Sequence, residues 1–224
     1  MALAQCWMLI RGYCLYRKSG NIPTGGQGIW PAFWMLPSEG PDCTSGEGLY
    51  GHWPMSGEID IMEAVNDMKV TSAAIHFGGP GSRRRQVSAS LPEGHSLDRV
   101  LLYTSWQILG LKCRLGDLLS SHNCTISVQG YHVYRLDWRP HSMTFYVDKR
   151  PILKTVCSCT RGSKNGWHTA NGAGSRKCSS CSPFDRPFHI IFNLAVGGSW
   201  PGNPNCFTQF PQTMTVQSLQ VFAI

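Results

Sequence analysis

Residues 57–64 read GEIDIMEA and set three acidic residues in an otherwise apolar run. Isoleucine-rich runs of this length are typical of β-strands, in which alternate side chains point to opposite faces. Glu58 and Asp60 then share one face, whereas Glu63 would point into the core with the isoleucines. One inserted residue just past Asp60, a β-bulge, returns Glu63 to the face of the other two acids. We therefore predict a bulged strand that carries three carboxylates on one surface.

Two carboxylates that face one cleft are the minimum requirement for splitting a glycosidic bond with retention of configuration. One attacks the anomeric carbon, and the other protonates the leaving oxygen and later activates water, at a carboxyl separation of about 5–5.5 Å. Glu58 and Glu63 can form this pair, and Asp60 between them can hold the two at different pKa values. The motif alone leaves two alternatives: an exposed edge strand with solvated acids, and a calcium site of oxygen ligands.

Further blocks of the sequence accompany this motif in a fixed order. They are 28–37 (GIWPAFWMLP), 53–64 (WPMSGEIDIMEA), 74–79 (AIHFGG), 131–138 with 145–148 (YHVYRLDW, FYVD) and 183–202 (PFDRPFHIIFNLAVGGSWPG). Together these blocks resemble glycoside hydrolase family 16, the laminarinase-like β-glucanases. The resemblance covers roughly residues 26–80 and 131–222.

The resemblance implies a role for each acid. Glu58 would be the nucleophile, Glu63 the general acid/base, and Asp60 the residue that assists the nucleophile. The bulged spacing, with two residues between Asp60 and Glu63, resembles that of the 1,3-β-glucanases rather than the lichenases. It implies endo-acting hydrolysis of β-1,3 and, as an alternative, β-1,3-1,4 bonds in β-glucans. No cofactor and no catalytic metal are expected, although the convex side of this fold often holds a structural calcium.

A second set of residues falls at positions that resemble the family's cleft wall. It consists of Trp30, Trp34, Trp53, His76, Asn193 and Trp200. Sugar rings stack their flat C–H faces on indole rings, and their hydroxyls take hydrogen bonds from polar groups. Core packing is the alternative for each tryptophan. We favour it for Trp138, whereas for Trp53 and Trp200, beside Gly and Pro in expected loops, we favour the cleft. His76 has the alternative of a structural histidine.

Composition and resemblance both predict an all-β fold, a two-sheet β-sandwich jelly roll of the concanavalin-like lectin/glucanase type with a concave substrate cleft. The 224 residues suit one domain, of which 15% are charged and 38 (24 + 14) are Gly or Pro. In residues 188–196, alternate positions 188, 190, 192, 194 and 196 form an apolar face that belongs in a core.

The formal net charge is +7, with part of it in the run Arg83-Arg84-Arg85. We interpret that run as a solvated loop, because a nucleic-acid site would need a basic face interleaved with aromatic residues. No stretch of about 20 apolar residues exists to span a membrane. A monomer that binds β-glucan is expected.

Three regions depart from the family's pattern. The predicted catalytic domain is 20–224, preceded by an atypical segment 1–19 that does not resemble the family's opening strands and leaves the sheet incomplete there. Residues 1–19 also lack a recognisable signal peptide, because their positive residues follow the apolar run, although the resemblance implies an extracellular protein. Residues 81–130 are expected to be an atypical insertion.

The third departure is cysteine, of which there are ten. Cys157-x-Cys159 with Cys178-x-x-Cys181 loosely fits the spacing of a zinc site, and disulfides are the alternative. Other functional classes stay open: a non-catalytic β-glucan-binding lectin of the same fold, an inactive truncated or mis-spliced product, and transglycosylation. A lectin of this fold typically loses the catalytic glutamates, whereas this chain retains all three acids.

Overall fold

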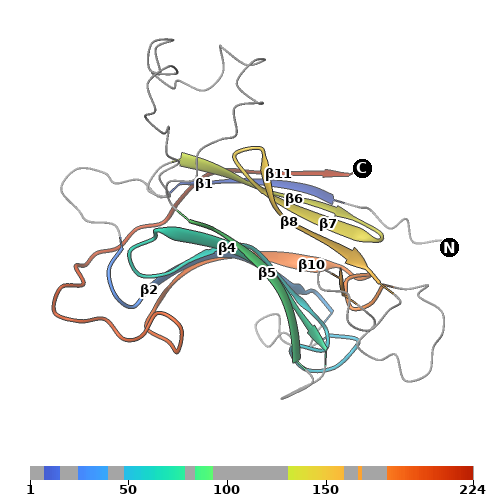
Figure 1. Cartoon of the computed structure of the whole chain (residues 1–224), viewed down its shortest axis with the longest axis horizontal. Helices are drawn as coiled ribbons and strands as arrows, with labels where there is room; N and C mark the ends of the chain where they lie inside the picture. The colour runs from blue at the N-terminus through green and yellow to red at the C-terminus, as the bar shows by residue number, and fades with distance from the viewer. Residues whose placement is uncertain are drawn as a thin grey trace, which may run out of the picture.

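The computed structural model describes residues 8–15, 25–39, 48–78, 84–92, 131–158, 166–167 and 181–223. Every helix or strand within these ranges is a β-strand (Figure 1). The strands are β1 (Met8–Leu15), β2 (Ile29–Pro37), β3 (Glu58–Ala64), β4 (Val70–Gly78), β5 (Arg84–Pro92), β6 (Tyr131–Arg139), β7 (Ser142–Val147), β8 (Arg150–Cys157), β9 (Gly166–Trp167), β10 (Phe188–Val196) and β11 (Thr215–Ala223).

The strands form two stacked sheets, as Figure 1 shows. One sheet has the order β11-β1-β6-β7-β8-β9, and the other has the order β10-β2-β3-β4-β5. Neighbouring strands pair antiparallel, except for β8 and β9, which pair in parallel. The predicted all-β sandwich is therefore confirmed.

The core lies between the two sheets because alternate side chains of each strand point inward. Phe33 and Ile59 of the five-stranded sheet are fully buried, as are Leu136 and Phe145 of the six-stranded sheet. Trp138 is 6% exposed and packs edge-on against Phe188, which confirms its predicted place in the core. The alternate side chains of β2, β3 and β4, which point away from the core, lie on the outer face of the five-stranded sheet.

The predicted bulge is present in β3. Asp60 pairs with Ala74 of β4 and Glu63 pairs with Ser72, so three steps along β3 lie opposite two steps along β4. The same offset appears against β2, where the register shifts between Phe33 and Trp34. Because of the extra residue, the side chains of Glu63 and Asp60 point to the same face of the sheet. Ile61 and Met62, between them, are buried.

Two segments form strands that the sequence reasoning did not anticipate. Residues 1–19 were expected to lack an opening strand, yet β1 pairs with both β11 and β6. Residues 81–130 were expected to be an insertion, yet β5 pairs along its whole length with β4. Arg84 and Arg85, predicted to belong to a solvated loop, instead begin β5 and pair with Gly78 and Phe77. Arg83 and residues 93–130 lie outside the described residues.

At the Val196 end of β10, the side chains are more exposed than the sequence predicts. Phe192 stacks on Phe33 at 4.5 Å between ring centroids, as the alternation predicts, whereas Val196 is 54% exposed. The small core cluster at this end, Ile29 with Ala64 and Met68, extends only as far as Leu194. Val196 is the next inward position beyond Leu194, so the cluster does not cover it.

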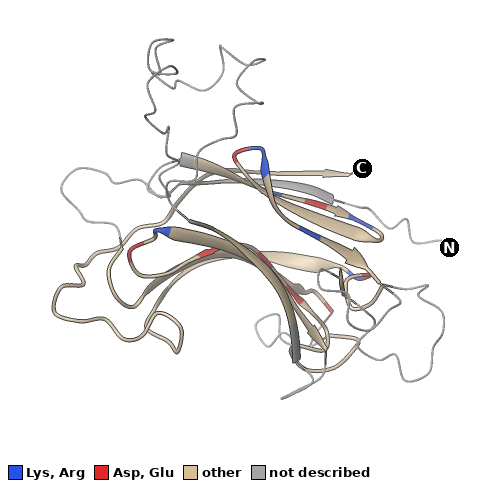
Figure 2. Ribbon diagram, in the orientation of Figure 1, with Lys and Arg blue, Asp and Glu red and all other residues tan. Residues whose placement is uncertain are grey.

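Charged residues are distributed unevenly over the two layers (Figure 2). Arg135, Arg139 and Lys154 lie on strands of the six-stranded sheet, while the acids of β3 lie in the five-stranded sheet. No helix among the described residues could cross a membrane.

Candidate active site

The predicted catalytic acids meet the predicted cleft residues on the outer face of the five-stranded sheet. Glu58 pairs across the strands with His76 of β4, and Asp60 pairs with Trp34 of β2. Because directly opposed residues of antiparallel strands point to the same face, these pairs and the acids share one surface. By the same register, this surface also includes Trp30 and Ala32 of β2 and Asn193 of β10.

Glu58 is held at its place by an indole. Trp53, in the turn before β3, donates its Nε1–H to Oε2 of Glu58, and His76 Nε2 lies 3.9 Å from Oε1. Burial raises the pKa of Glu58 from 4.5 to about 8, and the charge of Asp60 adds to this effect. The nearby histidine and the Trp53 hydrogen bond oppose the rise but do not cancel it.

Asp60 is the most deeply buried acid, with 1% of its surface exposed. Burial raises its pKa well above the usual range, the charge of Glu63 adds to this, and a side-chain hydrogen bond with Glu58 opposes it. His76 Nε2 lies 3.2 Å from Asp60 Oδ2, but the contact is not aligned as a regular hydrogen bond. We therefore treat it as an electrostatic contact that strengthens when His76 is protonated.

Glu63 resembles Glu58 in its environment. Trp30 donates its Nε1–H to Oε1 of Glu63 at 3.0 Å. Burial raises the pKa of Glu63, the Trp30 hydrogen bond lowers it, and the charge of Glu58 raises it again. The charge of Glu58 thus reaches Glu63, as the predicted pairing of a nucleophile with an acid requires. All three pKa values are raised, and because the carboxyls interact, their titrations are coupled.

Aromatic rings flank the acids on both sides. Trp30 and Trp200 meet edge to face at 5.4 Å between centroids, and Trp53 lies 5.9 Å from the His76 ring. Trp34 Nε1 donates a hydrogen bond to Asn193 Oδ1 at 2.8 Å. Trp200 is 50% exposed, so an indole face remains available to a ligand. The structure therefore brings every predicted site residue to this one surface.

The comparisons with known proteins agree with this geometry. The family model described as "XgeA-like, catalytic GH16 domain" matches residues 19–222. The chain belongs to glycoside hydrolase family 16. The matched range contains the recognised blocks from residue 28 to residue 202 and the bulged acidic strand.

Named relatives of this family 16 chain include both enzymes and a binding protein. The glucan endo-1,3-beta-glucosidase A1 of Niallia circulans is 30% identical over 207 residues, which are 90% of this chain and 23% of that protein. The beta-1,3-glucan-binding protein of Penaeus monodon is 30% identical over 179 residues, 78% of this chain and 40% of that protein. The chain thus spans less than half the length of either relative.

A solved structure supports the same fold. The endo-beta-1,3-glucanase from Pyrococcus furiosus superposes with a TM-score of 0.57 at 27% identity, covering 96% of this chain and 60% of that one. The shared part includes both sheets of the family 16 sandwich described here.

Three polar side chains of β5 share the outer face with the family 16 site and are absent from the predicted set. Gln86, Ser88 and Ser90 of β5 are exposed and lie directly opposite His76, Ala74 and Ser72, which places them on the outer face. The signal was present, because polar Gln86, Ser88 and Ser90 alternate with apolar Val87, Ala89 and Leu91. That period of two is typical of a half-buried strand, but residues 81–130 were treated as an insertion.

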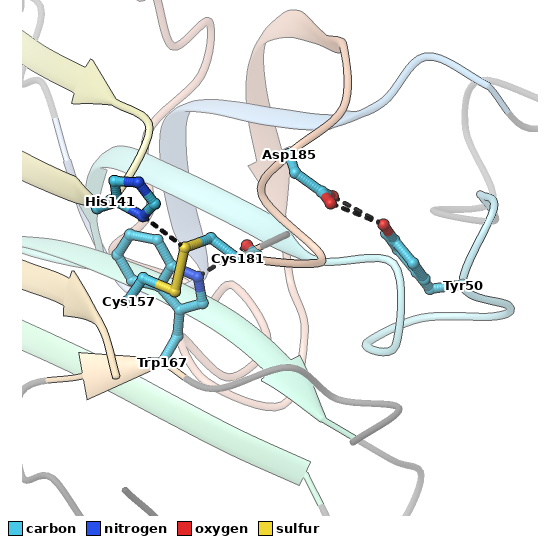
Figure 3. The surroundings of a disulfide bond; sticks show 6 residues. All are labelled: Tyr50, His141, Cys157, Trp167, Cys181 and Asp185. Atoms are coloured by element: carbon cyan, nitrogen blue, oxygen red, sulfur yellow. Dashed lines mark hydrogen bonds between the residues drawn. A yellow bond between two sulfur atoms is a disulfide. The ribbon is translucent and has the colours of Figure 1, made fainter. Parts of the chain in front are cut away.

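The loop that leads into β3 is anchored by contacts that sequence spacing does not reveal. Tyr50 donates its hydroxyl hydrogen to the carboxylate of Asp185, with both oxygens 2.9 Å away (Figure 3). Gly57, directly before Glu58, has φ +88°, and a Cβ there would lie 2.8 Å from Phe184 Cε1. The hydrogen bond and the close approach at Gly57 both join the chain before β3 to the segment before β10. They restrict the backbone conformation directly before Glu58.

Two groups of side chains could hold a metal ion among the described residues. Glu58, Asp60 and His76 place ligand atoms within 4.8 Å of one another, and so do His141, Cys157 and Cys181. Calcium takes 6–8 oxygen ligands, so two carboxylates and an imidazole suit it poorly. Cys157 and Cys181 are joined as a disulfide, the alternative to zinc that the sequence left open, while Cys159 and Cys178 lie outside the described residues.

Proposed function

We propose that this family 16 domain, predicted to span residues 20–224, is an endo-acting hydrolase of internal β-1,3-glucosidic bonds that works with net retention. The observation that supports this most is the placement of Glu58, Asp60 and Glu63 on one face of β3 by the bulge. The glucan endo-1,3-beta-glucosidase and endo-beta-1,3-glucanase relatives agree in substrate class. Bonds of β-1,3-1,4 glucans are the alternative substrate.

In the proposed first step, a carboxylate oxygen of Glu58 attacks the anomeric carbon while Glu63 gives its proton to the leaving glycosidic oxygen. The product is a glycosyl ester on Glu58. In the second step, Glu63 takes a proton from water, and the water oxygen displaces Glu58 from the anomeric carbon. Two inversions at one carbon give retention. Transglycosylation follows when a sugar hydroxyl replaces the water.

Asp60 supports this cycle as a proton partner of Glu58. The nucleophile must be ionised, yet burial raises the pKa of Glu58 to about 8. Asp60 is more deeply buried than Glu58, and burial raises its pKa well above the usual range. A proton that Asp60 holds for this reason leaves Glu58 anionic and ready to attack. A positively charged His76 favours the same state, because its charge lowers the pKa of Glu58.

The indoles serve both the acids and the substrate. Trp53 and Trp30 each donate a hydrogen bond to one glutamate, which limits the rotamers of the two reacting carboxyls. Trp200 and Trp34 offer ring surface for glucosyl units, and Asn193 offers an amide to their hydroxyls. We assign no cofactor to the reaction, because carboxylates suffice for it. A structural calcium on the convex side, a monomeric state and an extracellular location remain predictions, the last supported by the Cys157–Cys181 disulfide.

The test is release of reducing sugar from laminarin by the wild type and by Glu58→Gln. The variant should lose several orders of magnitude of kcat, because no ester can form. Asp67→Asn, which neutralises an exposed acid in the turn after β3, is the matched control and should retain full activity. Equal activity of wild type and Glu58→Gln would exclude the proposed mechanism.

Non-catalytic β-glucan binding is the second candidate function. The beta-1,3-glucan-binding protein among the relatives favours it, and the indole-lined face suits either role. Binding to laminarin without any turnover, in protein that unfolds cooperatively, would select this function. A chain with no cooperative transition would instead indicate an inactive product.

A further inference from the structure

A second cluster of ligating side chains lies apart from the three acids. His141 is in the turn between β6 and β7, Cys157 ends β8, and Cys181 precedes β10. The ligand atoms of the three lie within 4.8 Å of one another, and His141 Nδ1 is 2.9 Å from Cys181 Sγ. Figure 3 shows the imidazole directed at the sulfur of Cys181. This cluster shares no residue with the proposed hydrolase site.

Hydrogen bonds hold the three segments together independently of the bond between the two sulfurs. The Cys157 backbone N–H donates to the His141 carbonyl at 2.8 Å, and the Trp167 indole donates to the Cys181 carbonyl at 3.0 Å. The Ser158 N–H donates to the Trp167 carbonyl at 2.7 Å, and Trp167 itself is fully buried. None of these hydrogen bonds uses a sulfur atom, so none of them requires the disulfide to keep His141, Cys157 and Cys181 close together.

We propose that, when the Cys157–Cys181 disulfide is reduced, the two cysteines and His141 bind one zinc ion. A dithiol or phosphine reductant supplies two electrons, and two protons from water complete the two thiols. Zinc then displaces both thiol protons and takes the lone pair of neutral Nδ1. Two thiolates and an imidazole are ligands that zinc prefers, and water can complete the tetrahedron.

The disulfide and the proposed zinc site cannot exist at the same time. Zn–S bonds of about 2.3 Å and a Zn–N bond of about 2.0–2.1 Å in a tetrahedron set the sulfurs about 3.8 Å apart and each sulfur about 3.5 Å from Nδ1. Sulfurs at that separation are not bonded, so oxidation expels the ion. Only small side-chain rotations separate the two states, because the Cα atoms are 5.6 Å apart. His141 is exposed and gives the ion a path to the buried Cys181.

The test is titration of the whole chain with Co²⁺, a coloured substitute for zinc, in oxidised form and after anaerobic phosphine reduction. We expect one ion per reduced chain, with thiolate-to-cobalt charge transfer and the visible bands of tetrahedral cobalt. Zinc should bleach the signal, and the oxidised chain should show none. His141→Ala, a change in an exposed turn, should weaken binding roughly tenfold or more. Cys206→Ser is the matched control, since Cys206 is exposed and free, and should bind as the wild type does.

Several outcomes overturn the proposal. They are equal cobalt binding by the oxidised chain, no binding by the reduced chain, and unchanged affinity in His141→Ala. Loss of binding in Cys159→Ser and Cys178→Ser with full binding in Cys181→Ser also overturns it. Loss of the native fold on reduction does the same, because the site requires these segments to remain together. None of these results bears on glucan hydrolysis.

Discussion

Replacing Glu58 by glutamine should stabilise the folded domain at alkaline pH, although it removes the proposed nucleophile. Burial and the charge of Asp60 raise the pKa of Glu58 from 4.5 to about 8. A carboxyl with a raised pKa binds its proton more tightly in the folded state than in the unfolded state. The free energy of unfolding therefore falls as pH rises between the two pKa values, and the loss is complete above the folded pKa.

The size of this effect follows from the two pKa values. The step from 4.5 to about 8, at about 1.36 kcal/mol per pH unit, gives an upper limit of about 5 kcal/mol. Burial also raises the pKa of Asp60, and any proton that Asp60 retains weakens its repulsion of the Glu58 carboxylate. We therefore expect Glu58→Gln to be more stable than the wild type by about 2–5 kcal/mol above about pH 8, and nearly equal to it near pH 4.5.

Urea unfolding of both proteins at about pH 5 and about pH 9 measures the difference directly. Asp67→Asn is the control, because the Lys69 hydrogen bond lowers the pKa of exposed Asp67 and its neutralisation should destabilise the domain slightly. A Glu58→Gln protein that is less stable than the wild type at about pH 9 would contradict a raised pKa of Glu58 in the folded state. So would a difference of the same size at both pH values.

Other consequences concern the indoles and the loop before β3. Trp30→Phe removes the hydrogen bond that lowers the pKa of Glu63, so the alkaline limb of the pH profile of kcat/KM should move to higher pH; an unchanged limb would contradict that assignment. Gly57→Ala should lower stability by about 1–3 kcal/mol, seen as a lower Tm, because φ is +88° and the new Cβ would meet Phe184. Trp200→Ala removes a half-exposed stacking surface and should raise KM roughly tenfold with kcat little changed; a fall in kcat alone would exclude a simple binding role.

The bulge in β3 could be predicted from sequence because the alternative is energetically implausible. Without it, Glu63 would place a carboxylate among buried isoleucines, which is costly unless the charge is paired. The structure resolves the conflict as predicted, with three steps of β3 opposite two of β4. The core position of Trp138 in a strand, and the loop positions of Trp53 and Trp200 near Pro, could be predicted in the same way. Trp30 and Trp34 also lie in a strand, β2, and only the pairing register shows which face they share with the acids.

Long-range contacts and unfamiliar strands could not be predicted in the same way. The Tyr50–Asp185 hydrogen bond joins residues 135 positions apart, and nothing local in either segment indicates the other. β5 was missed although its alternation was visible, because unusual sequence around it suggested an insertion. The exposure of Val196 depends on where a small core cluster ends, which periodicity alone does not reveal.

The central claim is that Glu58 and Glu63 act on one anomeric centre from the same face of β3. Proton NMR of the first sugar released from a β-1,3-glucan tests it most directly, because the anomeric signal is read before mutarotation. Because the proposed mechanism retains configuration, the β-anomer should form first in the wild type, and no product should form in Glu58→Gln. Initial release of the α-anomer, or undiminished release by Glu58→Gln, would contradict it.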